Sequence, residues 1–326
     1  MIVEVSAPSN IALIKYMGKI DSVGNIPTNS SLSWTLNELQ TFVRISLRED
    51  FVQDQWQPLT RPGLDQVHLN EVSIQRFLNH FKSIKKEWKI EKYFLVESAN
   101  NFPSDCGLAS SASSFAALTK GAVEIFQKFS LRSGIGLVEM AELSRRGSGS
   151  SCRSFFHPWA LWDKDGVRAL EFSSPSLLHQ VVVVTDKKKL VSSSEAHRRV
   201  SSSPLFKDRV ERAEQRLTEI IHALKNQNWR ALHKTSWDEF LDMHSLFETS
   251  VPPFSYLETA SQEILDSAKA LWDSSGDGPV VTMDAGANVH FLWRPDQLDQ
   301  AKKLTQKFAN KYRVVSCKEI REVLEV

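Results

Sequence analysis

The stretch Cys106-Gly107-Leu108-Ala109-Ser110-Ser111-Ala112-Ser113-Ser114 ends a polar loop and opens an apolar helical pattern. Gly, Ala and Ser let a backbone approach a ligand closely, and the N-terminus of a helix favours an anion. We therefore interpret 106–114 as a phosphate-binding segment. The alternative is tight packing, because small residues also let two elements lie close together. The spacing is neither that of a Walker A loop nor that of a dinucleotide fingerprint.

A second segment of small residues is Gly147-Ser148-Gly149-Ser150-Ser151-Cys152-Arg153-Ser154. Arg153 can hold a carboxylate or phosphate through two N–H groups at once. Alternatively, it is a surface arginine that follows a helix C-cap at Gly147. A serine nucleophile is disfavoured, because that motif needs a preceding strand and a helical pattern stands here instead. Two such segments predict a protein that holds two phosphorylated ligands.

Two further segments carry charged groups. In Lys15-Tyr16-Met17-Gly18-Lys19, two lysines four residues apart can line one side of an anion pocket. The alternative is an amphipathic turn with exposed lysines. In Thr282-Met283-Asp284-Ala285-Gly286-Ala287-Asn288, an acid ends a strand just before a Gly turn. An Asp there is more often a turn former that bonds its own backbone.

Strand and helix patterns alternate without a strict βαβ order, which indicates α+β lobes. Residues 10–33 are interpreted as a long connection, and 97–105 as a polar segment. The polar, basic stretch 186–203 is interpreted as a lobe boundary or a loop ordered by an anionic ligand. Strands are expected at 2–5, 42–47, 93–96, 159–162, 170–172, 180–184, 279–283, 288–293 and 313–316. Helices are expected at 72–87, from 108 to about 126, at 138–146, around 217–224, around 232–247, at 264–272 and at 297–309.

The composition is that of an ordinary globular enzyme, with 41% hydrophobic and 24% charged residues. Forty basic residues against 39 acidic ones give no electrostatic case for nucleic acid or a membrane surface. The local clusters Lys187–Lys189 and Arg198-Arg199 are interpreted as solvated loop charge. Three scattered cysteines and a start without an apolar leader predict a reduced, cytoplasmic location. The histidines show no metal-binding spacing, and His244 is expected to be a core residue.

Taken in order, the motifs resemble those of the mevalonate diphosphate decarboxylases of the GHMP kinase superfamily. The resemblance reaches from Val3 to near the C-terminus. Its motifs are 7–19 (APSNIALIKYMGK), 27–31 (PTNSS), 100–112, 147–154 and 284–286 (DAG).

By position, the resemblance implies that Asp284 is the catalytic aspartate facing the substrate 3-hydroxyl and that Lys15 pairs with it. Arg153 matches the residue that holds the substrate carboxylate, with Ser148 beside it. The remaining assignments place Tyr16, Lys19 and Arg76 at the 5-diphosphate, Ser193 (or its neighbour Ser192) on a loop that closes over the site, and Ser98, Asn100, Gly107, Ala109, Ser110 and Ser111 at the nucleotide.

The resemblance also implies a GHMP-kinase-like, two-lobed α+β fold with a deep central cleft. The N-terminal lobe (1–185) would resemble ribosomal protein S5 domain 2 and bind nucleotide. The C-terminal lobe (186–326) would be ferredoxin-like and contribute the aspartate. The implied reaction uses ATP and Mg²⁺, with no permanent protein metal site, to convert mevalonate 5-diphosphate into isopentenyl diphosphate. The expected partners are these small molecules and a second copy of the chain in a homodimer, with no nucleic acid and no membrane.

Several positions depart from the family pattern: Met17 replaces Trp, Ala287 replaces Pro, and Asp105, Cys106 and His157-Pro158 are unexpected. Alternative functions are a decarboxylase of mevalonate 5-phosphate and a 3-kinase that phosphorylates only. Kinases of the latter kind are expected to lack the Asp–Lys pair. Two other classes are a nucleic-acid- or phospholipid-binding module and a serine hydrolase; the near-neutral charge and the missing nucleophile strand count against them.

Overall fold

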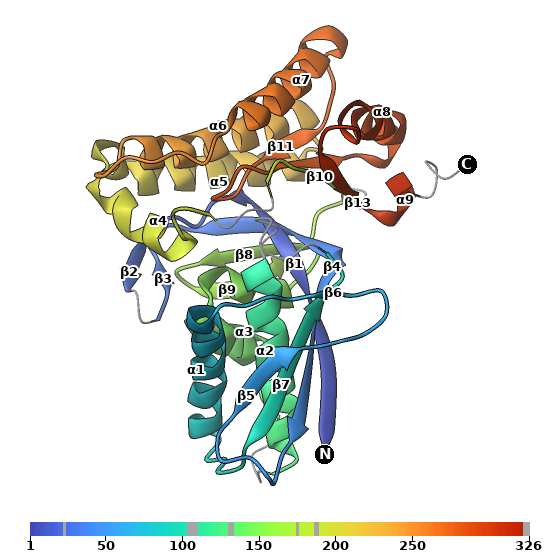
Figure 1. Cartoon of the computed structure of the whole chain (residues 1–326). Coiled ribbons are helices and arrows are strands. Elements are labelled where there is room, and N and C mark those ends of the chain that lie inside the picture. Colours follow the sequence, from blue (N-terminus) through green and yellow to red (C-terminus); the bar gives the residue numbers. More distant parts are fainter. Residues whose placement is uncertain (22–23, 103–109, 130–133, 174–175, 186–188, 322–326) are drawn as a thin grey trace.

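The computed structural model describes residues 1–21, 24–102, 110–129, 134–173, 176–185 and 189–321. These residues form two lobes, one built mainly from the first half of the chain and one from the second (Figure 1). Each lobe pairs a β-sheet with helices, so the predicted α+β class is confirmed.

The sheet of the first lobe is organised around two long antiparallel strands, β1 (Ile2–Ile14) and β4 (Ser31–Leu47). Strand β4 also pairs with strands on its other edge, and the described part of this sheet has seven strands. The other five are β5 (Gln55–Pro58), β6 (Asp65–Gln66), β7 (Phe94–Asn100), β8 (Trp159–Asp163) and β9 (Gly166–Leu170).

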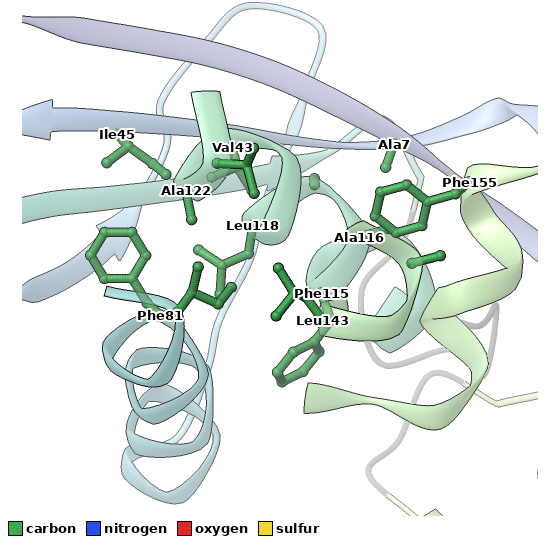
Figure 2. Close-up of a cluster of buried hydrophobic side chains, with 14 of the residues drawn as sticks. Ala7, Val43, Ile45, Phe81, Phe115, Ala116, Leu118, Ala122, Leu143 and Phe155 are labelled. Carbon is green, nitrogen blue, oxygen red and sulfur yellow. The ribbon is translucent and has the colours of Figure 1, made fainter. Parts of the chain in front are cut away.

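Three helices cover one face of this sheet: α1 (Glu71–Glu87), α2 (Ser110–Gln127) and α3 (Leu137–Gly147). Figure 2 shows the core between them, to which Val43 and Ile45 of β4, Phe81 of α1 and Leu118 of α2 contribute. Helix α2 lies close to the strands because its face is made of small residues. A Cβ at Gly121 would lie 2.9 Å from Ile45 Cδ1. Small residues of α2 beyond the segment 106–114 therefore serve close packing against the sheet.

The sheet of the second lobe has the order β11 (Val280–Thr282), β12 (Val289–Trp293), β10 (Leu178–Val183) and β13 (Arg313–Ser316). Strand β10 precedes the expected boundary at 185 but pairs with β12 and β13. The helices of this part of the chain are α4 (Ser193–Arg199), α5 (Arg209–Lys225), α6 (Trp229–Glu248), α7 (Thr259–Ser275), α8 (Leu298–Phe308) and α9 (Lys318–Arg321).

Each face of the second sheet has its own core. Val182 and Phe291 pack with residues of α7 and α8 on one face. On the other face, Val181 packs in a cluster with Ile11 of β1 and Leu217 of α5. Strand β1 therefore runs from the first lobe into the core between the lobes, which brings its C-terminal end to the junction.

The structure corrects several sequence predictions. Residues 10–33 are not one long connection, because β1 continues to Ile14, β4 begins at Ser31, and a small hairpin of β2 (Lys19–Asp21) and β3 (Ile26–Pro27) lies between them. The polar segment after residue 96 is strand as far as Asn100. In both places the side chains are polar and do not indicate a strand. The backbone is nevertheless extended there, because it pairs with β4.

Two further predictions differ from the structure in detail. The strand expected at 170–172 ends instead at Leu170, because β9 pairs with β8 in a hairpin. The stretch 186–203 includes helix α4, which Ser192 caps by accepting a hydrogen bond from Glu195 N. Nowhere in the described ranges is a helix both long and apolar enough to cross a membrane.

Candidate active site

A cavity of about 320 Å³ lies where the ends of β1 and β11 meet helices α2, α4 and α6 and the 3-10 helix Gly149–Phe155. Its lining includes ten residues that the sequence predicted for a site: Lys15, Tyr16, Lys19, Arg76, Ser110, Ser111, Ser148, Arg153, Ser193 and Asp284. Residues far apart in the sequence are therefore brought together as expected. Gly107 and Ala109, with Asp105 and Cys106, lie outside the described residues.

The centre of the cavity is an ion pair between the two lobes. Lys15 directly follows β1 and is 2% exposed, and its Nζ lies 2.8 Å from Asp284 Oδ1. Asp284 follows β11 and keeps 28% of its side chain exposed toward the cavity. Burial acts to raise the pKa of Asp284, but the Lys15 ammonium and its hydrogen bond lower it below the usual value. The carboxylate is therefore ionised at neutral pH.

The alternative interpretations of Lys15 as an exposed lysine and of Asp284 as a turn former that bonds its own backbone are wrong. Lys15 is not an exposed lysine, because only 2% of it is accessible. Gly286 N does donate to the Asp284 main-chain oxygen at 2.7 Å, so a turn is present, but the Asp284 side chain bonds Lys15 instead.

Arg153 is equally buried, at 3% exposure, on the 3-10 helix that follows α3. Its Nη1 donates to Ser31 Oγ at 2.9 Å and its Nε to Ser33 Oγ at 3.2 Å, both on β4. These bonds fix the plane of the guanidinium beside the cavity. The interpretation of Arg153 as a surface residue is wrong, and the buried charge stands where an anionic group would compensate it.

Tyr16, Lys19 and Arg76 form the basic end of the cavity. The Tyr16 ring lies 4.3 Å from the ring of His197 on α4, and Lys19 Nζ donates to Asn25 Oδ1 at 2.6 Å. Arg76 on α1 donates through Nη2 to Gly147 O at 2.7 Å. A second, wider cavity opens next to this end and shares Lys19, Arg76 and His197 with the first.

The serine candidates differ in what their side chains do. Ser110 and Ser111 at the start of α2 line the cavity, as do Ser148 and Ser193. Ser192 lines it too, but its Oγ caps α4, which leaves Ser193 as the better candidate of that pair. The other two nucleotide candidates bond within the sheet: Ser98 Oγ accepts from Trp56 Nε1 at 3.0 Å, and Asn100 Oδ1 accepts from Thr41 Oγ1 at 2.8 Å.

Sequence reasoning missed three polar groups of the site. Lys189 lines the cavity and donates from Nζ to Ala285 O, so it is not the solvated loop charge that the basic cluster predicted. His197 accepts from Gly18 N at 3.1 Å through Nδ1, and its ring contacts that of Tyr16 at an interplanar angle of 41°. His244 was expected in the core, where it is, yet its Nε2 lies 3.1 Å from Asp284 O.

Two departures from the family pattern fit their surroundings. Met17 is 2% exposed and packs with Met243, Phe247 and Ala285 in one apolar cluster. His157-Pro158 is a cis peptide that leads into β8.

Comparison with known proteins gives the same family over both halves of the chain. A family model for the diphosphomevalonate decarboxylase-like N-terminal domain matches residues 7–171, and one for the mevalonate 5-diphosphate decarboxylase C-terminal domain matches 180–325. Diphosphomevalonate decarboxylase of Saccharomyces cerevisiae is 32% identical, with 87% of this chain and 76% of the relative covered.

Solved structures give the same result. A mevalonate diphosphate decarboxylase from Legionella pneumophila is 45% identical, with a TM-score of 0.90 over 97% of this chain and 100% of the other. MDDEF in complex with MVAPP, AMPPCP and magnesium is 26% identical, with a TM-score of 0.86 over 97% of this chain and 96% of the other.

Proposed function

This chain belongs to the diphosphomevalonate decarboxylase family, and we propose that the pair of Asp284 and Lys15 carries out the family's reaction in it. The chain is an ATP-dependent diphosphomevalonate decarboxylase with a GHMP-kinase-like fold. It converts mevalonate 5-diphosphate to isopentenyl diphosphate and releases ADP, phosphate and CO₂. The single observation that supports the assignment of residues is the 2.8 Å contact of Lys15 Nζ with Asp284 Oδ1 at the cavity.

Asp284 acts on the 3-hydroxyl of the substrate. Its ionised carboxylate accepts the hydroxyl proton as the oxygen takes the γ-phosphoryl group of ATP, a contribution of about a hundred- to ten-thousandfold for a general base. The C3–O bond then breaks, phosphate leaves with the electron pair, and positive charge develops at C3. The leaving phosphate takes up the proton from Asp284, so the carboxylate is anionic again and favours the positive charge at C3. Loss of CO₂ then supplies the electrons of the new double bond and removes that charge.

Lys15 and Arg153 have electrostatic roles. The Lys15 ammonium keeps Asp284 ionised and helps to neutralise the phosphoryl group in transfer, a step that depends mostly on positioning and charge. Arg153 holds the substrate carboxylate through two N–H groups, with Ser148 beside it. That carboxylate would compensate the buried guanidinium charge until it leaves as CO₂.

The ends of the cavity separate the two ligands. Tyr16, Lys19, Arg76 and Ser193 bind the 5-diphosphate at the basic end. Ser98, Asn100, Ser110 and Ser111, with Gly107 and Ala109, bind ATP. In support, Ser110 and Ser111 open α2, an 18-residue helix whose N-terminus favours phosphate.

Mg²⁺ enters with ATP, whose phosphate oxygens suit it better than nitrogen or sulfur ligands. Within the described ranges, no three His, Cys, Asp or Glu side chains gather as a potential metal site. The ion would supply charge neutralisation to the phosphates. A relative with bound magnesium and AMPPCP supports this arrangement.

The division of labour and the assembly are proposals as well. The N-terminal lobe binds nucleotide and the C-terminal lobe provides the aspartate. The boundary expected between residues 185 and 186 is moved to before β10 (Leu178–Val183), because β10 pairs with β12 and β13. We further propose a cytoplasmic homodimer. Light scattering coupled to size exclusion tests the dimer: a mass of twice 37.0 kDa is expected, and a monomer mass contradicts it.

One assay tests the function. The chain is incubated with ATP, Mg²⁺ and either mevalonate 5-diphosphate or mevalonate 5-phosphate, and CO₂ and phosphate are followed. CO₂ release with the diphosphate is expected. Faster turnover of the monophosphate would assign the alternative substrate, and ADP formation without CO₂ would make the chain a 3-kinase.

A further inference from the structure

We propose that helix α6 positions the catalytic ion pair: Glu239 holds the main chain of Lys15, and His244 holds the main chain of Asp284. The inference rests on the proposed function of that pair. Lys15 and Asp284 come from different lobes and lie 269 residues apart in the chain. One helix that bonds both backbones sets the distance between them.

The Lys15 end is held by three side chains. Strand β1 ends at Ile14, so the Lys15 backbone needs other partners. Its N–H donates to Glu239 Oε1 at 2.9 Å, and its C=O accepts from Asn29 Nδ2 at 2.9 Å and from Arg209 Nη2 at 3.3 Å. The backbone from which the ammonium projects is thereby fixed.

Glu239 is itself immobilised in a buried charge network. Arg209 Nη1 donates to Glu239 Oε2 at 2.9 Å, and Arg216 Nη1 donates to the same oxygen at 3.0 Å. Both arginines also reach Asp242 Oδ2 at 2.9 Å. Glu239 and Arg209 are fully buried, so their charges have no solvent to screen them and depend on these partners. The carboxylate therefore cannot turn away from Lys15 without breaking several bonds.

The Asp284 end is held by the same face of α6. His244 Nε2 lies 3.1 Å from the main-chain oxygen of Asp284, which can only accept, so Nε2 carries the proton. Burial lowers the pKa of His244 to about 4, which keeps the ring neutral. Two turns earlier, Ser236 Oγ donates to Val281 O of β11 at 2.9 Å. Ser236, Glu239 and His244 lie on the same side of the helix, because residues three and four apart are neighbours on a helix surface. Helix α6 therefore lies along β11 and contacts the residues at its end.

The 2.8 Å contact between Lys15 Nζ and Asp284 Oδ1 is sensitive to small displacements of either backbone. Displacing reacting groups by about 1 Å can cost on the order of a hundredfold in rate. Loss of His244 leaves the Asp284 carbonyl with its second donor, Gly286 N at 2.7 Å, so the turn itself would survive. A variant at 244 therefore separates positioning from folding.

The test compares His244→Phe with His244→Gln. Phenylalanine fits a ring already surrounded by Phe240, Phe247 and Tyr256 but donates nothing, whereas glutamine restores an N–H of similar reach. In His244→Phe we expect kcat to fall about tenfold or more, with KM for both substrates within about twofold and Tm within a few degrees. His244→Gln should recover most of the loss. The control is Asp238→Asn, at a partly exposed position of the same helix, which should behave as the wild type.

Equal kcat in His244→Phe and the wild type would overturn the positioning role, as would a fall that glutamine does not rescue. Absence of CO₂ release by the wild type would instead remove the proposed function. Glu239→Gln tests the Lys15 end: kcat should fall with KM retained, and an unchanged kcat in the folded variant contradicts the role of Glu239. If that variant does not fold, the His244 pair decides the proposal.

Discussion

Single residues determine the chemistry because a buried lysine, Lys15, and a partly exposed aspartate, Asp284, meet at the cavity. Lys15 holds the pKa of Asp284 below its usual value against the opposite effect of burial. The aspartate can therefore accept a proton at neutral pH, and the site needs no external base.

Replacement of Asp284 by alanine should abolish turnover while ATP-analogue binding survives. The change removes the base and the anion that favours charge at C3, but it touches no proposed nucleotide residue. Turnover is measured as CO₂ release and binding by calorimetry with AMPPCP. If nucleotide affinity is lost together with activity, Asp284 is a structural residue.

Arg153→Lys should impair catalysis although the charge is kept. A lysine cannot bond Ser31 and Ser33 and present a planar pair of N–H groups to a carboxylate at the same time, so we expect a loss of about ten- to a hundredfold in kcat/KM. The matched control is Arg168→Lys, whose arginine holds Asp163 with two bonds on the surface. Near-native rates in Arg153→Lys would remove the carboxylate-holding role.

Sequence reasoning found the residues that stand in motifs and missed those that do not. Asp284 stands just before a Gly turn, Arg153 follows the glycines at 147 and 149, and Lys15 stands in a motif of its own. Glu239 carries no such sign, because a glutamate on an amphipathic helix is usually exposed. Its burial follows from Arg209 and Arg216 of α5, and a pairing between two helices cannot be read from either helix alone.

At the scale of elements, the 3-10 helix after α3 sets the shape of the basic end. A Cβ at Gly149 would lie 2.6 Å from Tyr16 Cε1, so only glycine lets the ring pack there. The Tyr16 ring is also held by Trp162 at 4.9 Å and His197 at 4.3 Å. On these two sides the Tyr16 ring cannot move away from an added Cβ, so it can yield only toward the cavity that it lines.

Gly149→Ala should displace the Tyr16 ring and weaken substrate binding. We expect KM for mevalonate 5-diphosphate to rise about tenfold, roughly the free energy of one hydrogen bond, with KM for ATP little changed. Gly136→Ala is the control, since no atom lies within 4 Å of its added Cβ and its φ is −71°. A rise in both KM values would mean that the change disturbs the whole cavity.

Prediction of elements succeeded where apolar periodicity was long and failed where pairing alone defines a strand. Helices α1, α2 and α3 lie within a few residues of their expected bounds. Strand β5 was missed because Gln55-Trp56-Gln57-Pro58 has little apolar character and is held by parallel pairing with β7. The far end of β1 was missed for the same reason at Pro8, Ser9 and Asn10.

At the scale of the whole molecule, buried neutral histidines link folding to pH. Burial lowers the pKa of His80 and His197 to about 3 and of His244 and His290 to about 4, and it also lowers that of His179. Below the unfolded pKa of about 6.5, the unfolded chain binds protons that the folded one does not. The stability that these residues contribute is therefore complete above 6.5 and is lost as pH falls toward the folded values.

The free energy of unfolding should accordingly decrease between pH 6.5 and 5.5, by about 1 kcal/mol for each such histidine. Urea titrations at pH 7.5, 6.5 and 5.5 measure the decrease. His80→Gln should make the dependence shallower, whereas His222→Gln, at an exposed position, should leave it as it is. Stability that is constant across this range would contradict the neutral, buried state of these rings.

The position of β10 in the middle of the second sheet determines which C-terminal fragment of the chain could keep that sheet intact. β13 pairs with β10, as does β12. A C-terminal fragment that starts at residue 186 would lose this central strand and leave β13 detached from the β11–β12 ribbon. Only a fragment that begins before Leu178 keeps the sheet whole, and even that piece would need its N-terminal complement, because Lys15 would be on the other half.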